Sequence, residues 1–360
     1  MSKIHELLGA AVEEKASDIF IRAMKNVSFK INSSLVKHGE MLSVEESQEM
    51  VMELFRLANR TDERLSQSGD DDFPITLPGI ARFRVSAYKQ RGTYAAVVRV
   101  VLFDLPDYKQ LGIPEEVMTI AKEKNGLVLV TGAAGSGKTT TLASIIDAIN
   151  KTRNSHIITL EDPIEYLHKD RESLVSQREI STDTDSYLTA LRACLRQAPD
   201  IVLLGEMRDH ETIRVAMTAA ETGHLIISTL HTVGVVNTID RIVDVFPPNQ
   251  QQQVRVQLSM LLRTVVSQQL LKSSIGGGLI PAFEIMHVNS AIRNMIRESK
   301  THQIDNAIQT SANLGMISMD AYMLGLVQEG KITPETALSQ SSNPDQMTRR
   351  LDEIAKSAKR

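Results

Sequence analysis

The sequence of 360 residues contains no tryptophan, and aromatic residues make up only 4% of it. Proteins that bind single-stranded nucleic acid stack successive bases on aromatic side chains, and this composition supplies few of them. The formal net charge of −4 gives no overall attraction to nucleic acid or to an anionic membrane. The composition therefore predicts that nucleic acid is not a partner.

Cysteine is almost absent, because Cys194 is the only one. A single cysteine cannot form an intramolecular disulfide, and a cysteine-rich zinc site is excluded for the same reason. No apolar run approaches the roughly 18 residues of a membrane span, and residues 2–6 carry no secretory signal. These features predict a cytoplasmic protein that reaches a membrane only through a partner, without direct insertion.

Glycine, in contrast, marks one stretch of functional interest. Residues 132–139 read GAAGSGKT and fill every position of the pattern G-x-x-x-x-G-K-[ST]. A short apolar run at 127–130 precedes this stretch, and a segment with helical spacing at 142–149 follows it. Strand, glycine loop and helix in this order predict a loop that binds the phosphates of a nucleoside triphosphate.

Each residue type in this loop suits that chemistry. The glycines permit backbone angles that side chains forbid, and they let the main chain approach a polyphosphate closely. Lys138 supplies a positive charge for the β- and γ-phosphates, and the Thr139 hydroxyl is placed to bind Mg²⁺. We therefore expect the nucleotide to contact Gly132, Gly135, Ser136, Gly137, Lys138, Thr139 and Thr140.

Carboxylates follow two other apolar runs. Glu206 comes after the run at 201–204, where a nucleotide-binding sheet presents an acid toward Mg²⁺ and water. The run at 157–160 is followed by Glu161 and then by Glu165. Either glutamate could orient and deprotonate the attacking water, and spacing alone does not separate them.

Two histidines, His224 and His231, flank a further apolar run at 225–229. On an unbroken strand this spacing directs them to opposite faces. We expect one buried structural histidine and one phosphate sensor. A zinc site is disfavoured, because no third ligand has suitable spacing.

The pattern of the chain changes near residue 104. We expect an α+β domain at 1–103, a linker at 104–113 marked by Pro106, Gly112 and the following Pro114, and a second domain at 114–360. In the first domain the periodicity predicts helices at 4–12 and 44–59 and strands at 18–22, 27–32, 80–88 and 94–102. The acidic run at 69–72 is predicted to be a solvated turn.

In the second domain, helices alternate with short apolar runs, which favours a mostly parallel sheet wrapped by helices. The fold class is therefore α/β. The predicted strands are 127–130, 155–160, 201–204 and 225–229, and helical spacing dominates later at 254–271, 290–299, 319–328 and 348–359. A glycine-rich break at 276–278 precedes a short apolar run at 279–286.

Three arginines, Arg82, Arg84 and Arg99, lie on predicted strands of the first domain. Arginines on a sheet ordinarily face solvent. A cleft between two domains would instead let them bind the phosphates of the nucleotide.

Taken together, these segments resemble the PilT family, the hexameric retraction ATPases of type IV pili within the secretion-ATPase superfamily. Four boxes carry the resemblance: GAAGSGKTT as Walker A, IITLEDPIE as the Asp box, IVLLGEMRD as an atypical Walker B and TGHLIISTLHT as the His box. The segment AIRNMIRE at 291–298 closely matches the AIRNLIRE of the retraction branch. By spacing it is an amphipathic helix with Ile292, Met295 and Ile296 directed inward.

The resemblance implies a PAS-like N-terminal domain, a RecA-like P-loop ATPase domain and a helical C-terminal region from about residue 290. It implies ATP and Mg²⁺ as cofactors, with Thr139 and Glu206 at the metal. It favours Glu165 over Glu161 as the general base. It also implies that His231 contacts the γ-phosphate.

The same resemblance implies that Arg84 and Arg99 reach the nucleotide, with Arg82 as a further candidate. The chain would form a homo-hexamer and act on an inner-membrane pilus platform protein, and an accessory retraction ATPase is a further candidate partner. It would work in the cytoplasm, held at the inner face of the membrane through the pilus machinery.

The predicted function is ATP hydrolysis that drives type IV pilus retraction, pilin disassembly and twitching motility. A pilus extension or type II secretion ATPase is the nearest alternative, although the four-cysteine zinc insert of the extension branch is missing. A RecA-like nucleic-acid motor and a subunit that binds ATP without hydrolysis are more remote alternatives.

Overall fold

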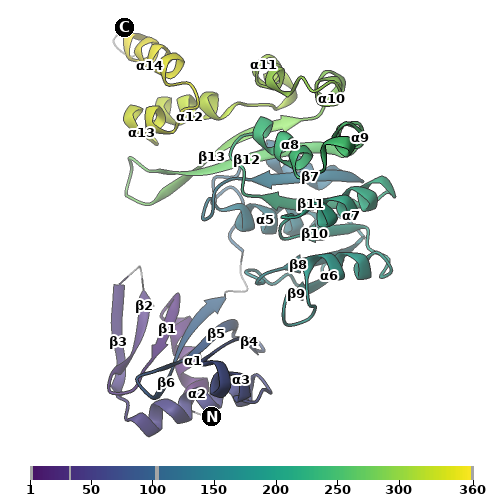
Figure 1. Ribbon diagram of the computed structural model, residues 1–360. Helices are drawn as coiled ribbons and strands as arrows, with labels where there is room; N and C mark the ends of the chain where they lie inside the picture. The colour runs from purple at the N-terminus through teal and green to yellow at the C-terminus, as the bar shows by residue number, and fades with distance from the viewer. Residues whose placement is uncertain (1–2, 32–33, 102–104, 358–360) are drawn as a thin grey trace. The chain divides into compact units, whose positions relative to one another are not determined.

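The computed structural model describes residues 3–31, 34–101 and 105–357, which form two compact units (Figure 1). The first unit is Met1–Asp104 with Glu165–Leu167, and the second is Leu105–Ile164 with His168–Arg360. Part of the predicted linker at 104–113 belongs to the second unit, where Ile113 is buried in a hydrophobic core. Some residues of the predicted elements lie outside the described residues, namely Asn32, Leu102, Asp104, Ala358 and Lys359.

The first unit is a six-stranded antiparallel sheet with three helices. The sheet has the order β3-β2-β1-β6-β5-β4. Its strands are β1 Asp18–Ile21, β2 Asn26–Ile31, β3 Ser34–Met41, β4 Asp70–Leu77, β5 Ala81–Gln90 and β6 Thr93–Val101; its helices are α1 Lys3–Glu13, α2 Val44–Leu57 and α3 Glu63–Ser68. Strand residues alternate between faces, so Phe83 and Val85 enter the core, whereas Arg82 and Arg84 point away from it.

The beginning of α2 follows the predicted capping box. The Ser43 side chain accepts a hydrogen bond from the backbone N–H of Glu46, and the Glu46 carboxylate accepts one from the backbone N–H of Ser43. Both donors would otherwise lack a partner at the helix terminus, so this pair fixes where α2 begins.

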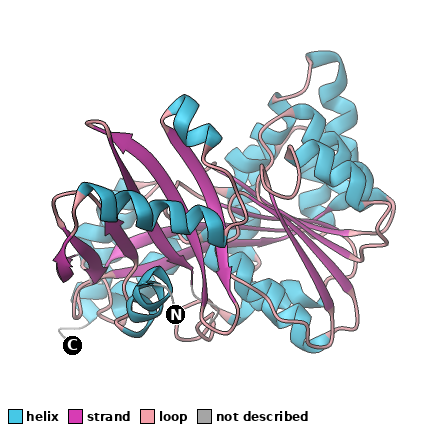
Figure 2. Ribbon diagram, turned by 90° about the horizontal axis from the view of Figure 1, so that it is seen from below, coloured by secondary structure: helices cyan, strands magenta, loops and turns pink. Residues whose placement is uncertain are grey.

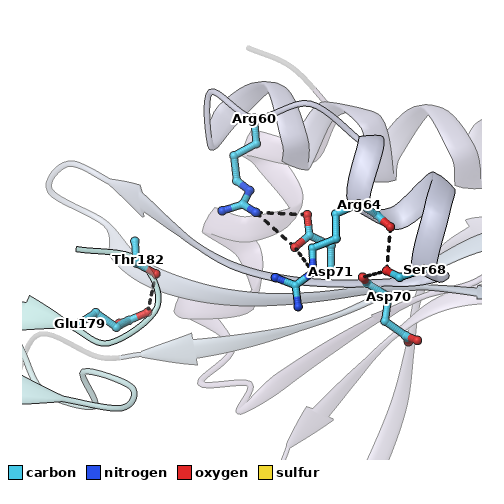
Figure 3. Close-up of polar contacts among 7 residues, drawn as sticks. All are labelled: Arg60, Arg64, Ser68, Asp70, Asp71, Glu179 and Thr182. Atoms are coloured by element: carbon cyan, nitrogen blue, oxygen red, sulfur yellow. Dashed lines mark hydrogen bonds and ion pairs between the residues drawn. The ribbon is translucent and has the colours of Figure 1, made fainter. Parts of the chain in front are cut away.

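The prediction of a solvated turn at residues 69–72 is wrong, because Asp70 begins β4. Asp71 occupies an inward position of this strand, and its side chain is completely buried. Arg60 Nη2 donates to both of its carboxylate oxygens at 3.2 and 3.3 Å, and Arg64 Nε lies 3.8 Å from Oδ1 (Figure 3). Three consecutive acids are typical of a loop, and only these two cations make a buried carboxylate tolerable there.

The second unit contains a seven-stranded sheet with the order β13-β12-β7-β11-β10-β8-β9. Its strands are β7 Gly126–Thr131, β8 His156–Glu161, β9 Leu174–Glu179, β10 Ile201–Leu204, β11 Leu225–Leu230, β12 Leu262–Lys272 and β13 Leu279–His287. All neighbours pair in parallel except β12 and β13, which form an antiparallel hairpin. The predicted parallel strands are confirmed, and the α/β fold class with them.

Helices cover both faces of this sheet, as the colouring by secondary structure shows (Figure 2). One core contains α4 Glu115–Met118, η1 Thr119–Lys122 and α5 Lys138–Thr152; the other contains α6 Tyr187–Cys194, α7 His210–Glu221, α8 Val235–Asp244, α9 Pro248–Leu261 and α10 Ser290–Arg297. Successive strand residues serve opposite cores: Leu127 and Leu129 pack on one side, and Val128 and Val130 on the other. This two-sided burial explains why the strands read as continuous apolar runs.

The predicted helix at 254–271 is wrong in its second half. Helix α9 ends at Leu261, and the chain continues at once as β12, which pairs with β7. A strand buried on both faces has an unbroken apolar pattern, which periodicity does not distinguish from a buried helix. The β-branched residues Thr264, Val265 and Val266 were the signal that favoured a strand.

The C-terminal region is helical, as predicted. After α10 come η2 Thr301–Gln303, α11 Ile304–Thr310, η3 Ala312–Leu314, α12 Met319–Gln328, α13 Pro334–Gln340 and α14 Pro344–Ser357. In α10, Ile292 and Ile296 are buried and Met295 packs against the same core, which confirms the amphipathic helix. Helices α12 to α14 form a small core with Leu271 and Ala282 of the β12–β13 hairpin.

The buried carboxylate of Asp71 can be tested against its exposed neighbour. We expect Asp71→Ala to lower the free energy of unfolding by about 1–3 kcal/mol, because Arg60 and Arg64 lose their shared partner. Asp72→Ala, at an exposed position of the same strand, should change it by less than about 0.5 kcal/mol. Urea unfolding followed by circular dichroism measures both, and equal shifts would contradict the assignment.

Candidate nucleotide-binding site

The chemically distinctive segments meet at one edge of the second unit's sheet. The parallel strands β7, β8, β10 and β11 run in the same direction, so their carboxyl ends lie together. Gly132 follows β7, Glu161 is the last residue of β8, Glu206 follows β10 and His231 follows β11. The sequence placed each of these residues at a strand end, and pairing of the strands brings them together.

The glycine loop lies tightly against β12. Gly132 has φ 145°, and a Cβ atom there would be only 2.2 Å from the backbone oxygen of Gln268. Gly137, with φ 87°, would place a Cβ atom 2.8 Å from Gln268 Nε2. Space and backbone conformation both exclude a side chain at Gly132, whereas Gly137 is favoured by its left-handed backbone conformation.

Lys138 folds back over this loop. Its ammonium group donates to the carbonyl oxygens of Gly132 at 2.9 Å and Ala133 at 2.8 Å. Burial lowers the pKa of Lys138, and the nearby charge of Glu206 raises it. Within the described residues, the buried Ser136 hydroxyl has no hydrogen-bond partner. A cation and an unpaired hydroxyl in a glycine-rich loop are the groups that a bound phosphate would use.

Gln268 is a site residue that sequence reasoning missed. It is buried on β12, and its Oε1 accepts a hydrogen bond from Thr141 Oγ1 at 2.7 Å in the first turns of α5. It was missed because the stretch at 254–271 was predicted to be a helix. A buried glutamine within a β-branched run was the only available signal.

Glu206 is held between two basic side chains. Arg208 Nη2 lies 2.8 Å from Glu206 Oε1, and His231 Nε2 lies 3.2 Å from Oε2. His231 is exposed, whereas the Glu206 side chain is only 14% exposed. The predicted Walker B acid and the predicted phosphate sensor are therefore in direct contact.

The other histidine does not fit its prediction. His224 precedes β11 and is only partly buried, so the expected buried structural histidine is wrong. Its Nδ1 lies 2.9 Å from the carbonyl oxygen of Ala219 and 3.2 Å from Thr222 Oγ1, at the end of α7. These contacts indicate a histidine that satisfies the last turn of a helix.

Glu161 is buried at the end of β8. Its Oε1 accepts hydrogen bonds from Thr159 Oγ1 at 2.6 Å and from Gln177 Nε2 at 3.2 Å. Glu165, in contrast, is exposed in the loop that follows β8. The geometry thus gives the two glutamates different surroundings, which spacing alone did not.

The loop between these glutamates is fastened by a third acid, Glu179. Its Oε2 accepts the backbone N–H of Ile164 at 3.1 Å, and its Oε1 lies 3.5 Å from Thr182 Oγ1 (Figure 3). Glu179 is buried at the end of β9 and pairs in register with Glu161. It therefore fixes the chain directly before Glu165.

Tyr187 is a further residue that the sequence did not indicate. A Cβ atom on Gly205 would be 2.6 Å from its hydroxyl oxygen, so the tyrosine packs closely across the end of β10. Burial raises the pKa of Tyr187, and the negative charges of Glu206, Asp162 and Glu161 raise it further. Its phenol therefore stays protonated beside a group of acids.

The three arginines lie in the first unit, on the outer face of its sheet. Arg84 and Arg99 are directly opposite each other on β5 and β6, and Arg82 is two residues from Arg84 on the same face. Arg99 Nε lies 3.0 Å from Asp18 Oδ1. Their contact with the nucleotide stays a prediction.

The residues present suit Mg²⁺. Thr139 and Thr140 stand in the first turn of α5, and Glu206 lies at the same edge of the sheet. In residues 3–31, 34–101 and 105–357 no group of three or more histidine, cysteine or acidic side chains could hold a metal ion. Mg²⁺ needs no such group in a phosphate site, because phosphate and water oxygens complete its coordination.

A phosphate-binding loop, an acid two strands away and a sheet wrapped on both faces define a P-loop ATPase. The family model described as "Type II/IV secretion system protein" matches residues 1–276. The chain belongs to this family and is one of its ATPases.

Individual relatives are similar over almost the whole chain. The type IV pilus retractation ATPase PilT of Pseudomonas aeruginosa is 43% identical, over 95% of this chain and 99% of its own. A twitching motility protein of Neisseria gonorrhoeae is 44% identical over 86% of this chain and 84% of its own. The crystal structure of the pilus retraction motor PilT with bound ADP superposes with a TM-score of 0.89 at 41% identity, over 97% of this chain and 100% of that one.

The close approach of the loop to β12 predicts unequal effects of two glycine substitutions. Gly132→Ala should weaken ADP binding at least roughly tenfold, because the new methyl group would displace the Gln268 backbone. Gly135→Ala meets no atom within 4 Å and carries only the cost of a left-handed backbone, about 1 kcal/mol. Calorimetric titration with ADP measures both, thermal unfolding checks that each variant is folded, and equal losses would contradict the prediction.

Proposed function

We propose that this protein is a motor ATPase whose hydrolysis of ATP drives retraction of a type IV pilus. The observation that supports this most directly is the complete phosphate loop with Glu206 and His231 at the same sheet edge. The likeness to pilus retraction ATPases over nearly the full length of both chains supports the assignment to pili.

In this proposal each residue at the sheet edge has a defined role. Lys138 and the loop N–H groups bind the β- and γ-phosphates, and Thr139 and Glu206 would hold Mg²⁺. When bound, the metal ion neutralises charge on the phosphate oxygens. Glu165 accepts the proton of the attacking water, because it is exposed whereas Glu161 is already engaged by Thr159 and Gln177.

His231 senses the γ-phosphate in this scheme. Its contact with Glu206 gives it a fixed position at the end of β11, while its exposed ring leaves surface for a ligand. A change at the phosphate would then reach the loop that joins β11 to α8.

The first unit supplies arginines to the nucleotide. Neighbouring positions across four strands are occupied, in register, by Lys30, Asp18, Arg99 and Arg84, and Arg99 forms an ion pair with Asp18. Like charges directly opposite each other destabilise a sheet unless an anion compensates them. Bound phosphates would provide that anion, and movement of this domain would follow the nucleotide state.

We further propose that six chains form a ring and that the ring acts on an inner-membrane pilus platform protein. An accessory retraction ATPase could share this work. Among the described residues, no helix has the length and apolar character needed to cross a membrane. In this proposal the platform protein holds the motor at the cytoplasmic face of the inner membrane.

Turnover and assembly can be tested on the same samples. Glu206→Ala should reduce ATP hydrolysis at least ~100-fold while the particle mass remains that of the wild-type ring. Glu172→Ala removes an exposed acid from the same unit and should leave turnover unchanged. Steady-state ATPase assays measure turnover, and mass photometry measures the particle mass. If the wild type is a monomer without turnover, the proposal of a motor ATPase is wrong.

The choice between the two glutamates has its own test. Glu165→Gln should lower kcat by about 10²–10⁴-fold, the usual contribution of a general base, with ADP affinity unchanged. Glu161→Gln should have a smaller effect, because its carboxylate serves two internal hydrogen bonds. The opposite order of effects in single-turnover hydrolysis would move the base to Glu161.

A further inference from the structure

A further buried carboxylate, Glu284 on β13, has no part in the site described above. Its Oε2 accepts the backbone N–H of Val235 at 2.9 Å, and the backbone N–H of Met319 stabilises its charged form. The adjacent Ile285 exchanges backbone hydrogen bonds of 2.8 and 3.1 Å with Ile317, two residues before Met319. The residue is only 8% exposed. One side chain therefore joins two segments that are far apart in the sequence.

Both of these segments are helix N-termini. Val235 is the first residue of α8, and Met319 is the first residue of α12. Both helices contact β13, where Glu284 lies (Figure 1). The residue that caps α8 is Gly234, which has no side chain, so Glu284 accepts a hydrogen bond in place of a capping side chain.

The α8 end of this connection leads directly to His231. Residues 231–234 form the loop between β11 and α8, and the Gly234 N–H donates to Ser267 Oγ at 2.9 Å. In the same loop Thr232 Oγ1 lies 2.8 Å from Thr238 Oγ1, which lies 3.3 Å from Thr131 Oγ1 at the end of β7. The histidine loop is thus bound to the strand that precedes the phosphate loop.

The α12 end leads to the C-terminal helices. Helix α12 packs with α13 and α14 on the β12–β13 hairpin. Asp320, the second residue of α12, accepts hydrogen bonds from Ser341 and Ser342, which lie between α13 and α14. A shift of these helices would therefore reach the first turn of α12.

We propose that Glu284 is a positioning residue for hydrolysis, which fastens the loop carrying His231 to the C-terminal helical region. This inference rests on the proposed function, in which His231 contacts the γ-phosphate. Glu284 itself touches no nucleotide. It holds two elements whose relative position decides where His231 lies.

The charge of Glu284 makes this fastening sensitive to pH. Burial raises its pKa to about 7, the N–H groups of Val235 and Met319 lower it, and the charges of Asp305 on α11 and Asp320 on α12 raise it. Protonation removes the negative charge that both helix N-termini favour. The fastening therefore weakens as the pH falls through about 7.

Stability should change in the opposite direction. Because the folded-state pKa lies above the ordinary 4.5, the folded protein favours protonated Glu284. This contribution to stability is complete below pH 4.5 and is lost as the pH rises through about 7. Relative to Glu284→Gln, the wild type therefore becomes less stable over the same range in which it becomes more active.

The test measures kcat and KM for ATP from pH 5.5 to 8.5 with the full chain. In the wild type, kcat should fall as the pH drops through about 7; we call this fall the acid limb. At pH 8, Glu284→Gln should lower kcat roughly 5-fold or more with KM within about 2-fold of the wild-type value. In this variant the acid limb should be absent. Asp305→Asn is the matched control, since it removes a neighbouring acid on α11 whose charge raises the pKa of Glu284. In Asp305→Asn, kcat should still fall at low pH, but the fall should occur at a lower pH because the charge of Asp305 no longer raises the pKa of Glu284.

Hydrogen exchange at pH 8 tests the fastening without catalysis. In Glu284→Gln, the amides in the first turns of α8 and α12 should exchange faster together than in the wild type. Wild-type kinetics with the acid limb unchanged, or faster exchange in α12 alone, would overturn the proposal. If the wild type does not hydrolyse ATP, the proposed function fails, while exchange still decides whether Glu284 joins the two helices.

Discussion

The close approach of Gly132 to the Gln268 backbone is the constraint on which the site depends. It requires β12 to lie beside β7, and it sets the phosphate loop against a rigid, doubly buried strand. Lys138 can then fold over the loop, and Thr141 can bind Gln268 at the start of α5. A loop with a side chain at position 132 could not occupy this place, whatever the rest of the sequence.

Around this loop, buried carboxylates fix the backbone rather than react. Glu179 holds the segment before Glu165, and Glu284 holds the start of α8 after the histidine loop. Each of these carboxylates accepts a hydrogen bond from a backbone N–H group, which compensates part of the free-energy cost of burying the charge. Glu206, by contrast, keeps its contacts with Arg208 and His231 at the open edge of the sheet. The acid proposed to act in hydrolysis thus contacts charged side chains, whereas the supporting acids bind backbone N–H groups.

Much of the site could be predicted because its residues lie in short contiguous motifs. Gly132 to Thr140, Glu206 and His231 each follow an apolar run, and a parallel sheet gathers the carboxyl ends of such runs. Gln268 and Glu284 could not be found in this way. They lie on β12 and β13, whose burial on both faces hid the strand period, and a polar residue in an apolar run does not reveal its partner.

The sequence by itself determined the phosphate loop, the alternation of strands and helices and the amphipathic face of α10, because local propensity and spacing encode them. Only the tertiary structure decided that Asp71 is a buried strand residue, since its tolerance depends on Arg60 and Arg64 beside it. It also decided that Glu284 joins α8 to α12. Charges are buried where distant segments compensate them, and that compensation is a property of the packed chain.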